Sequence, residues 1–115
     1  MGIFVSSGTD VLKVESAGQI KGAERAVTGV AAGWDLSEGN NWSIGAVAVP
    51  QPTNGVSGQS GTVRVTTQPT SWPVGGALKY PAGTAPVLTA YPAVFPFYVV
   101  DANNVLLGYA TEGVS

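Results

Sequence analysis

The chain has 115 residues, which is the length of one domain, so we expect a single domain over residues 1–115. Only 10% of the residues are charged and the net charge is −2, without a basic run, so no nucleic-acid partner is expected. No stretch approaches the ~20 apolar residues of a membrane span, and the N-terminus lacks the features of a signal peptide. The absence of cysteine excludes disulfide bonds and fits synthesis in a reducing cytoplasm.

Short β-branched and aromatic runs alternate with glycine, proline, asparagine and serine along the chain. No run has the 3.6-residue apolar period of a helix. The expected strands are, in chain order, Gly2–Val5, Val11–Val14, Gln19–Lys21, Ala26–Ala31, Trp42–Val49, Gly61–Thr67, Gly76–Tyr80, Val94–Val100 and Val105–Tyr109. Many short strands in one small domain predict an all-β fold, an antiparallel β-sandwich or a jelly-roll-like barrel.

Two of these segments allow more detailed predictions. In Gly61–Thr67 the alternation places Val63 and Val65 in the core and turns Arg64 outward. Val94–Val100 is almost wholly apolar but contains a proline, which cannot donate a backbone hydrogen bond and therefore indicates an edge strand or a bulge. The Asp-Ala-Asn-Asn sequence after it predicts a turn, so residues 94–109 are expected to form a C-terminal hairpin.

The chain offers little for catalysis or metal binding. Histidine and cysteine, the commonest general base, thiol nucleophile and metal ligands, are absent. The carboxylates stand singly in turn-like contexts, at Asp10, Glu15, Glu24, Asp35, Glu38, Asp101 and Glu112. Asp101 with Asn103 and Asn104 could belong to a calcium loop, but the glycine of the EF-hand pattern is missing and a hairpin turn explains them better. We expect no enzyme, no cofactor and no metal.

Two motifs resemble a known family. Ser57–Val65 reads SGQSGTVRV, and Lys79–Pro86 reads KYPAGTAP after Trp72. This succession resembles a small β-domain of virion proteins of tailed phages, cyanophages especially, over about residues 55–110. Ala82 stands where the family pattern has the first glycine of a Pro-Gly-Gly-Thr turn. Earlier residues match more loosely, through Gly33-Trp34 and Asn41-Trp42.

The remaining candidates are aromatic and apolar residues that could contact a partner. Trp34, Trp42 and Trp72 are expected in the core, with an interface as the alternative. The segment from Tyr91 to Phe97 places apolar residues around prolines, as a docking surface would. The expected interface residues are Ile3, Phe4, Val5, Arg64, Tyr91, Phe95 and Phe97.

The resemblance implies a non-enzymatic structural protein of the phage virion. We expect it to be a capsid decoration protein, a cement or knob, on the head surface. The alternatives are a tail-fibre or receptor-binding module and a carbohydrate-binding module. The expected partners are the major capsid protein or tail proteins and further copies of the chain, such as a trimer, with a host-surface glycan as another candidate. The expected location is the virion, after synthesis in the host cytoplasm.

Overall fold

The structure is a computed structural model, and it describes residues 23–114. The expected strands Gly2–Val5, Val11–Val14 and Gln19–Lys21 lie outside these residues, so their prediction stays untested. The described residues form six strands and two short 3-10 helices. In chain order these are β1 (Glu24–Ala26), η1 (Leu36–Glu38), β2 (Asn41–Ile44), β3 (Ser60–Val65), β4 (Leu78–Lys79), η2 (Pro81–Gly83), β5 (Ala93–Asp101) and β6 (Asn104–Leu107).

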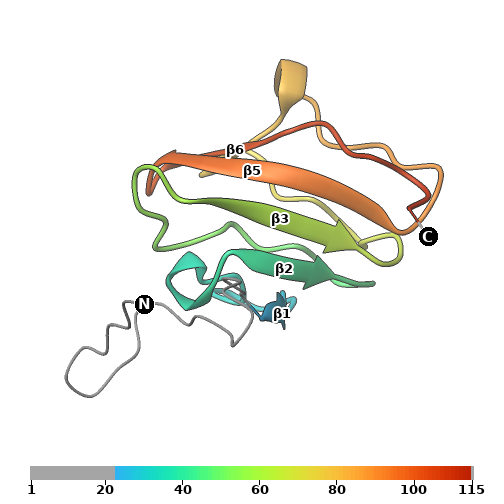
Figure 1. Ribbon diagram of the computed structural model, residues 1–115, viewed down its shortest axis with the longest axis horizontal. Helices are drawn as coiled ribbons and strands as arrows, with labels where there is room; N and C mark the ends of the chain where they lie inside the picture. Colours follow the sequence, from blue (N-terminus) through green and yellow to red (C-terminus); the bar gives the residue numbers. More distant parts are fainter. Residues whose placement is uncertain (1–22, 115) are drawn as a thin grey trace, which may run out of the picture.

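The six strands make one mixed sheet in the order β1-β2-β3-β5-β6-β4, and Figure 1 shows β2, β3, β5 and β6 lying side by side. The all-β prediction is confirmed, since helix is confined to η1 and η2 in the described residues. The expected purely antiparallel sheet is wrong. Three of the five pairings, β1 with β2, β2 with β3 and β4 with β6, are parallel. A parallel neighbour cannot be reached by a tight turn, so long connections must follow β1 and β2.

These long connections cover one face of the sheet and build the core with it. Inward residues of β2, β3, β5 and β6 alternate with outward ones, and the inward set is buried. The buried apolar residues are Val27, Trp34, Leu36, Trp42, Ile44, Val49, Val63, Val65, Leu78, Ala93, Phe95, Phe97, Val99, Val105 and Leu107. Four of them, Val27, Trp34, Leu36 and Val49, come from connections, so irregular chain stands where a second sheet would lie in a sandwich.

The covering connections are joined to one another by backbone hydrogen bonds. The amide of Leu36 donates to the carbonyl of Thr53 at 2.8 Å, and that of Thr53 donates back to Trp34 at 2.9 Å. Farther along, the amide of Val49 donates to Ser71 at 3.0 Å. Buried backbone groups need such partners, and these bridges provide them without a regular second sheet.

The SGQSG motif of the family resemblance has a structural role here. The side-chain amide of Gln59 donates to the carbonyl of Leu36 at 2.7 Å and to Oδ1 of Asn40 at 2.8 Å, which fastens the η1 connection to β3. A Cβ on Gly61 would lie 1.8 Å from the carbonyl oxygen of Asn40, so this position leaves room for glycine alone. The motif therefore fixes the residues around η1 against the start of β3.

The two strands predicted in the first half of the described chain are shorter than expected. Ala26–Ala31 is wrong beyond its first residue, because β1 ends at Ala26 and a turn follows, closed by a 2.9 Å bond from the Gly33 amide to Val30. Ala32 has a φ of 61° in that turn, which a strand does not allow. Trp42–Val49 is a strand only as far as Ile44, where Gly45 begins the next connection.

The C-terminal hairpin of β5 and β6 is confirmed. The two strands pair antiparallel, with Asp101 opposite Asn104 at the turn. The Asp101 carboxylate accepts the amide of Asn103 at 2.8 Å and the side chain of Asn104 at 3.0 Å, as expected of a turn built by Asx residues.

Pro96 does not place β5 at the edge of the sheet, but its missing N–H does interrupt the backbone pairing as expected. β5 lies between β3 and β6, so it is an interior strand and not an edge strand. The pairing of β6 with β5 nevertheless stops at Leu107, one residue before Gly108 comes opposite Pro96. The Pro96 carbonyl still accepts the Gly108 amide at 2.8 Å, but Pro96 has no N–H to return. The regular pairing therefore ends at the proline, and it resumes at the antiparallel bridge between Val94 and Thr111 with one extra residue on the segment after β6, as in the bulge predicted as the alternative.

Alternation in β3 is confirmed as predicted. Val63 and Val65 are fully buried, and Arg64 between them is exposed on the other face of the sheet.

Candidate interaction surface

The strands present a second face that the connections do not cover. On this open face, defined as the side of the sheet opposite the core, outward residues alternate with the buried ones along β2, β3, β5 and β6. Polar residues occupy it over β2 and β3, where Ser43 lies beside Arg64 in the pairing. Apolar residues occupy it over β5 and β6. The open face thus has a polar half and an apolar half.

The polar half is held by one ion pair. Arg64 donates to Glu24 through Nε at 2.9 Å and through Nη2 at 2.7 Å, reaching from β3 over β2 to β1. The hydrogen bonds from Arg64 lower the pKa of the Glu24 carboxyl, and the same contact raises the pKa of Arg64. Both groups are about two-fifths exposed, 44% for Arg64 and 39% for Glu24. They neutralise each other, which leaves this half without net charge.

The apolar half consists of Pro96, Tyr98, Val100 and Leu106, which we call the apolar strip. Tyr98 is 49% exposed, Val100 45% and Leu106 42%. The pairing of β5 with β6 sets Tyr98 directly opposite Leu106, so their side chains are neighbours on the same face. Apolar residues standing singly on a surface are ordinary, but four on two adjacent strands indicate a contact surface.

A shallow hollow of about 230 Å³ lies along the strip. It is lined by Pro96, Phe97, Tyr98, Leu106, Leu107 and Gly108. A Cβ on Gly108 would lie 2.6 Å from Cγ of Pro96, so the proline ring fills the space that a side chain would take. The hollow lies on the open face, so the surface of the apolar strip is slightly concave there.

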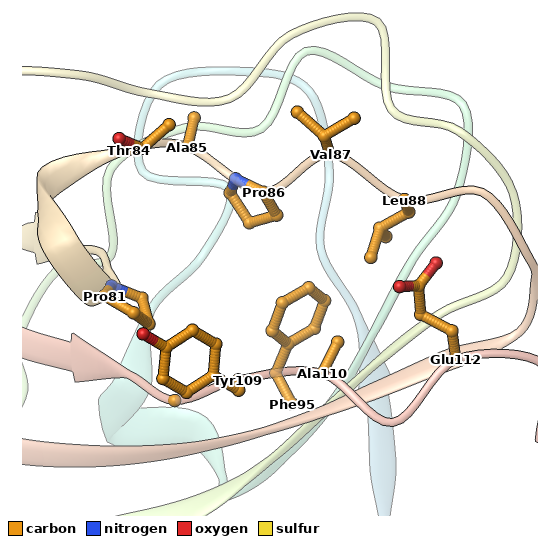
Figure 2. Close-up of a pocket in the computed structure, with 11 residues that line it drawn as sticks. Pro81, Thr84, Ala85, Pro86, Val87, Leu88, Phe95, Tyr109, Ala110 and Glu112 are labelled. Carbon is orange, nitrogen blue, oxygen red and sulfur yellow. The ribbon is translucent and has the colours of Figure 1, made fainter.

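A second apolar feature is a slit of about 340 Å³ between residues 81–88 and the segment that follows β6. Figure 2 shows Pro86, Val87 and Leu88 on one side and Tyr109 and Ala110 on the other. The Phe95 side chain reaches the slit, although it is only 2% exposed. Val87 is 83% and Tyr109 79% exposed, so the two walls offer large side chains to a partner.

Glu112 closes one end of the slit and is already engaged. Its carboxylate accepts the backbone amides of Thr89 at 2.7 Å and Ala90 at 3.2 Å. These bonds lower the pKa of Glu112, because they stabilise the ionised form. The carboxylate therefore ties the C-terminal segment to the wall of the slit through Oε1.

The aromatic residues of the family motifs pack together behind the slit. The Trp72 ring meets those of Tyr80 and Phe95 edge-on, with centroids 6.3 Å and 5.8 Å apart. The Tyr80 hydroxyl donates to the carbonyl of Pro73, and burial raises the pKa of Tyr80 to about 12. Trp72 is half-buried against the core, while Trp34 and Trp42 are inside it, as expected.

The expected interface residues differ in their exposure in the structure, and three of them lie outside the described residues. Phe95 and Phe97 are 2% and 3% exposed, so their prediction as surface contacts is wrong: they point to the covered face of β5. Arg64 is exposed but paired with Glu24, and Tyr91 is half-buried against the core beside a cis peptide bond to Pro92. Residues Ile3, Phe4 and Val5 lie outside the described residues. The apolar strip was missed, although the uninterrupted apolar run of β5 was its signal.

The carboxylates of Asp35 and Asp101 also accept local hydrogen bonds. Asp35 accepts the hydroxyl of Ser37 at 2.6 Å, the side chain of Asn54 at 3.1 Å and the amide of Ser37 at 3.0 Å, and these bonds lower its pKa. The turn bonds at Asp101 lower the pKa of that carboxyl in the same way. Within residues 23–114 no three Asp, Glu, His or Cys side chains lie close enough together to hold a metal ion. No helix in that range is long and apolar enough to cross a membrane.

Comparison with known proteins gives no match: no family model fits the chain, and no similar curated protein or solved structure was found.

Proposed function

We propose that this protein is a non-enzymatic structural component of a phage virion, and that it decorates the capsid. The observation that carries the proposal is the exposed apolar slit, with Val87 at 83% and Tyr109 at 79% exposure. Side chains of this size are usually exposed together where a protein meets a partner. The virion identity of the partner comes from the sequence resemblance.

Two further observations support the proposal. The carboxylates of Glu24, Asp35, Asp101 and Glu112 all have lowered pKa values, the opposite of what a general acid at neutral pH requires. At Ala82, where the family pattern has glycine, the backbone φ is 55°, a conformation that favours glycine. The glycine of the family pattern would suit this backbone conformation.

The mode of attachment follows from the low charge. With 10% charged residues, binding must rest on apolar area and backbone hydrogen bonds, which salt does not screen. The β-sandwich expected from the sequence stays part of this proposal, with the covering connections as its second layer.

A tail-fibre or receptor-binding module is the alternative that shares the same resemblance. Localisation separates the two. Virions of the phage that encodes the chain are labelled with antibodies against it and viewed by electron microscopy. Label on heads supports decoration, label on tails supports the fibre role, and absence from the particle contradicts both.

Retention on the particle tests the proposed attachment site. Purified virions carrying the wild-type chain or Tyr109→Ser are washed at increasing sodium chloride concentrations, and the retained protein is measured. We expect the wild type to survive high salt and Tyr109→Ser to be lost. The matched control is Val56→Ser, since Val56 is 65% exposed but does not line the slit. Release of the wild type by moderate salt would contradict an apolar attachment.

One observation favours a carbohydrate-binding role. The Tyr109 ring is exposed, and exposed aromatic rings can stack on sugars. A glycan array with wild type and Tyr109→Ser decides it: binding that depends on Tyr109 supports this role, and no binding removes it.

A further inference from the structure

We propose that the apolar strip is a self-association surface, through which copies of this chain pack sheet against sheet around a shared symmetry axis. This inference does not depend on the virion role. It concerns Pro96, Tyr98, Val100 and Leu106 of the open face, whereas the proposed virion attachment uses the slit.

The first argument is the pattern of β5. Its nine residues are apolar toward both faces up to Val100, a pattern typical of strands that are covered on both sides. The connections cover the inward face, where Phe97 and Val99 are 3% and 0% exposed. The outward face keeps Tyr98 49% and Val100 45% exposed. Among residues 23–114 the strand therefore has a cover on its inward face and none on its outward face.

The second argument is charge. The described open face gives a partner little charge to recognise: one internal ion pair, and Lys79 at the margin of the strip, which has no salt bridge within residues 23–114. Glu24 and Arg64 neutralise each other at 2.7 Å. Lys79, which pairs with Leu106 at the margin of the strip, turns its ammonium to the carbonyl of Gly76 at 2.7 Å. The strip itself consists of uncharged residues and matches an identical strip, and a symmetry axis brings the two together.

The third argument is geometry. The outermost strands of the sheet, β1 with 3 residues and β4 with 2, are too short to recruit a copy by edge pairing. Face-to-face packing at a spacing of ~10 Å is the usual way to cover a sheet.

The available area sets the expected strength. Standard strand spacing and rise give the sheet face a projected area of roughly 450 Å², and side chains standing out from it add to the buried surface. Stable interfaces bury ~800 Å² per partner and weak ones less than ~600 Å². We therefore expect a dissociation constant in the micromolar range.

Light scattering coupled to size-exclusion chromatography tests the proposal on the purified full chain. The wild type is expected to change from monomer to oligomer as concentration rises through the micromolar range. Tyr98→Asp should raise the dissociation constant at least ~100-fold, because its cross-strand neighbours are Ser60 and Leu106 and association would bury a carboxylate without a cation beside it. The matched control Val87→Asp, on the slit, should associate like the wild type. A wild type that stays monomeric, or a control that dissociates equally, overturns the proposal.

The absence of cysteine gives a second test that needs no destabilising change. Tyr98→Cys introduces a single thiol in the strip, and Val87→Cys introduces one outside it. Under mild oxidation we expect a disulfide-linked dimer to form faster with Tyr98→Cys. Equal rates of crosslinking at the two positions overturn the proposal. Both tests use the free protein, so their failure is separate from loss of retention on virions.

Discussion

β3 and β5 are neighbours in the sheet and carry opposite kinds of sequence. β3 alternates strictly, with Val63 and Val65 buried and Arg64 exposed. β5 buries Phe97 but also exposes apolar Tyr98 beside it. Both strands give the same core one covered face, so the difference lies only in what they turn away from it. The comparison shows that apolar and polar residues alternate where one face of a strand meets solvent. The loss of this alternation in β5 is the basis of our inference that its outward face binds a further surface.

The largest expected effect separates the two faces of β5. Phe97→Ala should lower the free energy of unfolding by ~3–5 kcal/mol, because removal of a ring that is only 3% exposed leaves a cavity in the core. Tyr98→Ala should cost less than ~1 kcal/mol in the monomer, since its side chain is half exposed. Urea unfolding at low protein concentration measures both. Similar losses for the two variants would show that the faces of β5 are not distinct.

The same comparison on β3 uses smaller side chains. Val65→Ala should cost ~1–3 kcal/mol, the range for truncating a buried aliphatic residue. Arg64→Ala should cost much less, because an exposed ion pair contributes little. Thermal or urea unfolding of the isolated domain measures the difference. Equal destabilisation would contradict the assignment of β3 faces.

The ion pair of the polar half is a smaller effect that depends on salt. Glu24→Gln should reduce the free energy of unfolding by ~0.2–1 kcal/mol at low ionic strength. The difference from wild type should shrink as sodium chloride rises, because salt screens exposed charges. A double-mutant cycle with Arg64→Ala isolates the pair. A coupling energy that salt does not change would argue against a simple surface ion pair.

The smallest expected effect is the acid response of Glu112. Its pKa is lowered from 4.5 in the folded state, so the unfolded state binds the proton more readily. Its contribution to stability is therefore complete above about pH 5 and is lost as the pH falls through 4.5 to the lower folded value. Glu112→Gln should unfold with a weaker dependence on pH over this range. An unchanged slope would mean that the bonds to Thr89 and Ala90 do not stabilise the fold.

The sequence carried the parts of the fold that depend on neighbours along the chain. The hairpin of β5 and β6 and the faces of β3 follow from a local turn and a local alternation. The parallel pairings could not be predicted, because the partners of β2 and β4 are set by strands far away in the sequence. Likewise, a run that is apolar on both sides, such as β5, does not say which side the connections will cover. That is why Phe95 and Phe97 were assigned to the surface and the apolar strip was not.

The slit was out of reach of sequence patterns for a similar reason. Its walls, Pro86 to Leu88 and Tyr109 to Ala110, are brought together by the pairing of β4 with β6. The proline-rich turn after β4 signalled a loop, but nothing local placed Tyr109 beside it. Only the register of distant strands determines such a site.

The mixed sheet also determines the order in which the chain can fold. β5 and β6 meet through a turn of a few residues, whereas β1 meets β2, and β2 meets β3, only after a long connection has closed. Closing a longer loop costs more conformational entropy before any contact forms, which slows folding. We expect the hairpin to be structured in the folding transition state and the parallel pairs to join it afterwards. φ-values near zero for Val105 and Leu107 would contradict that order.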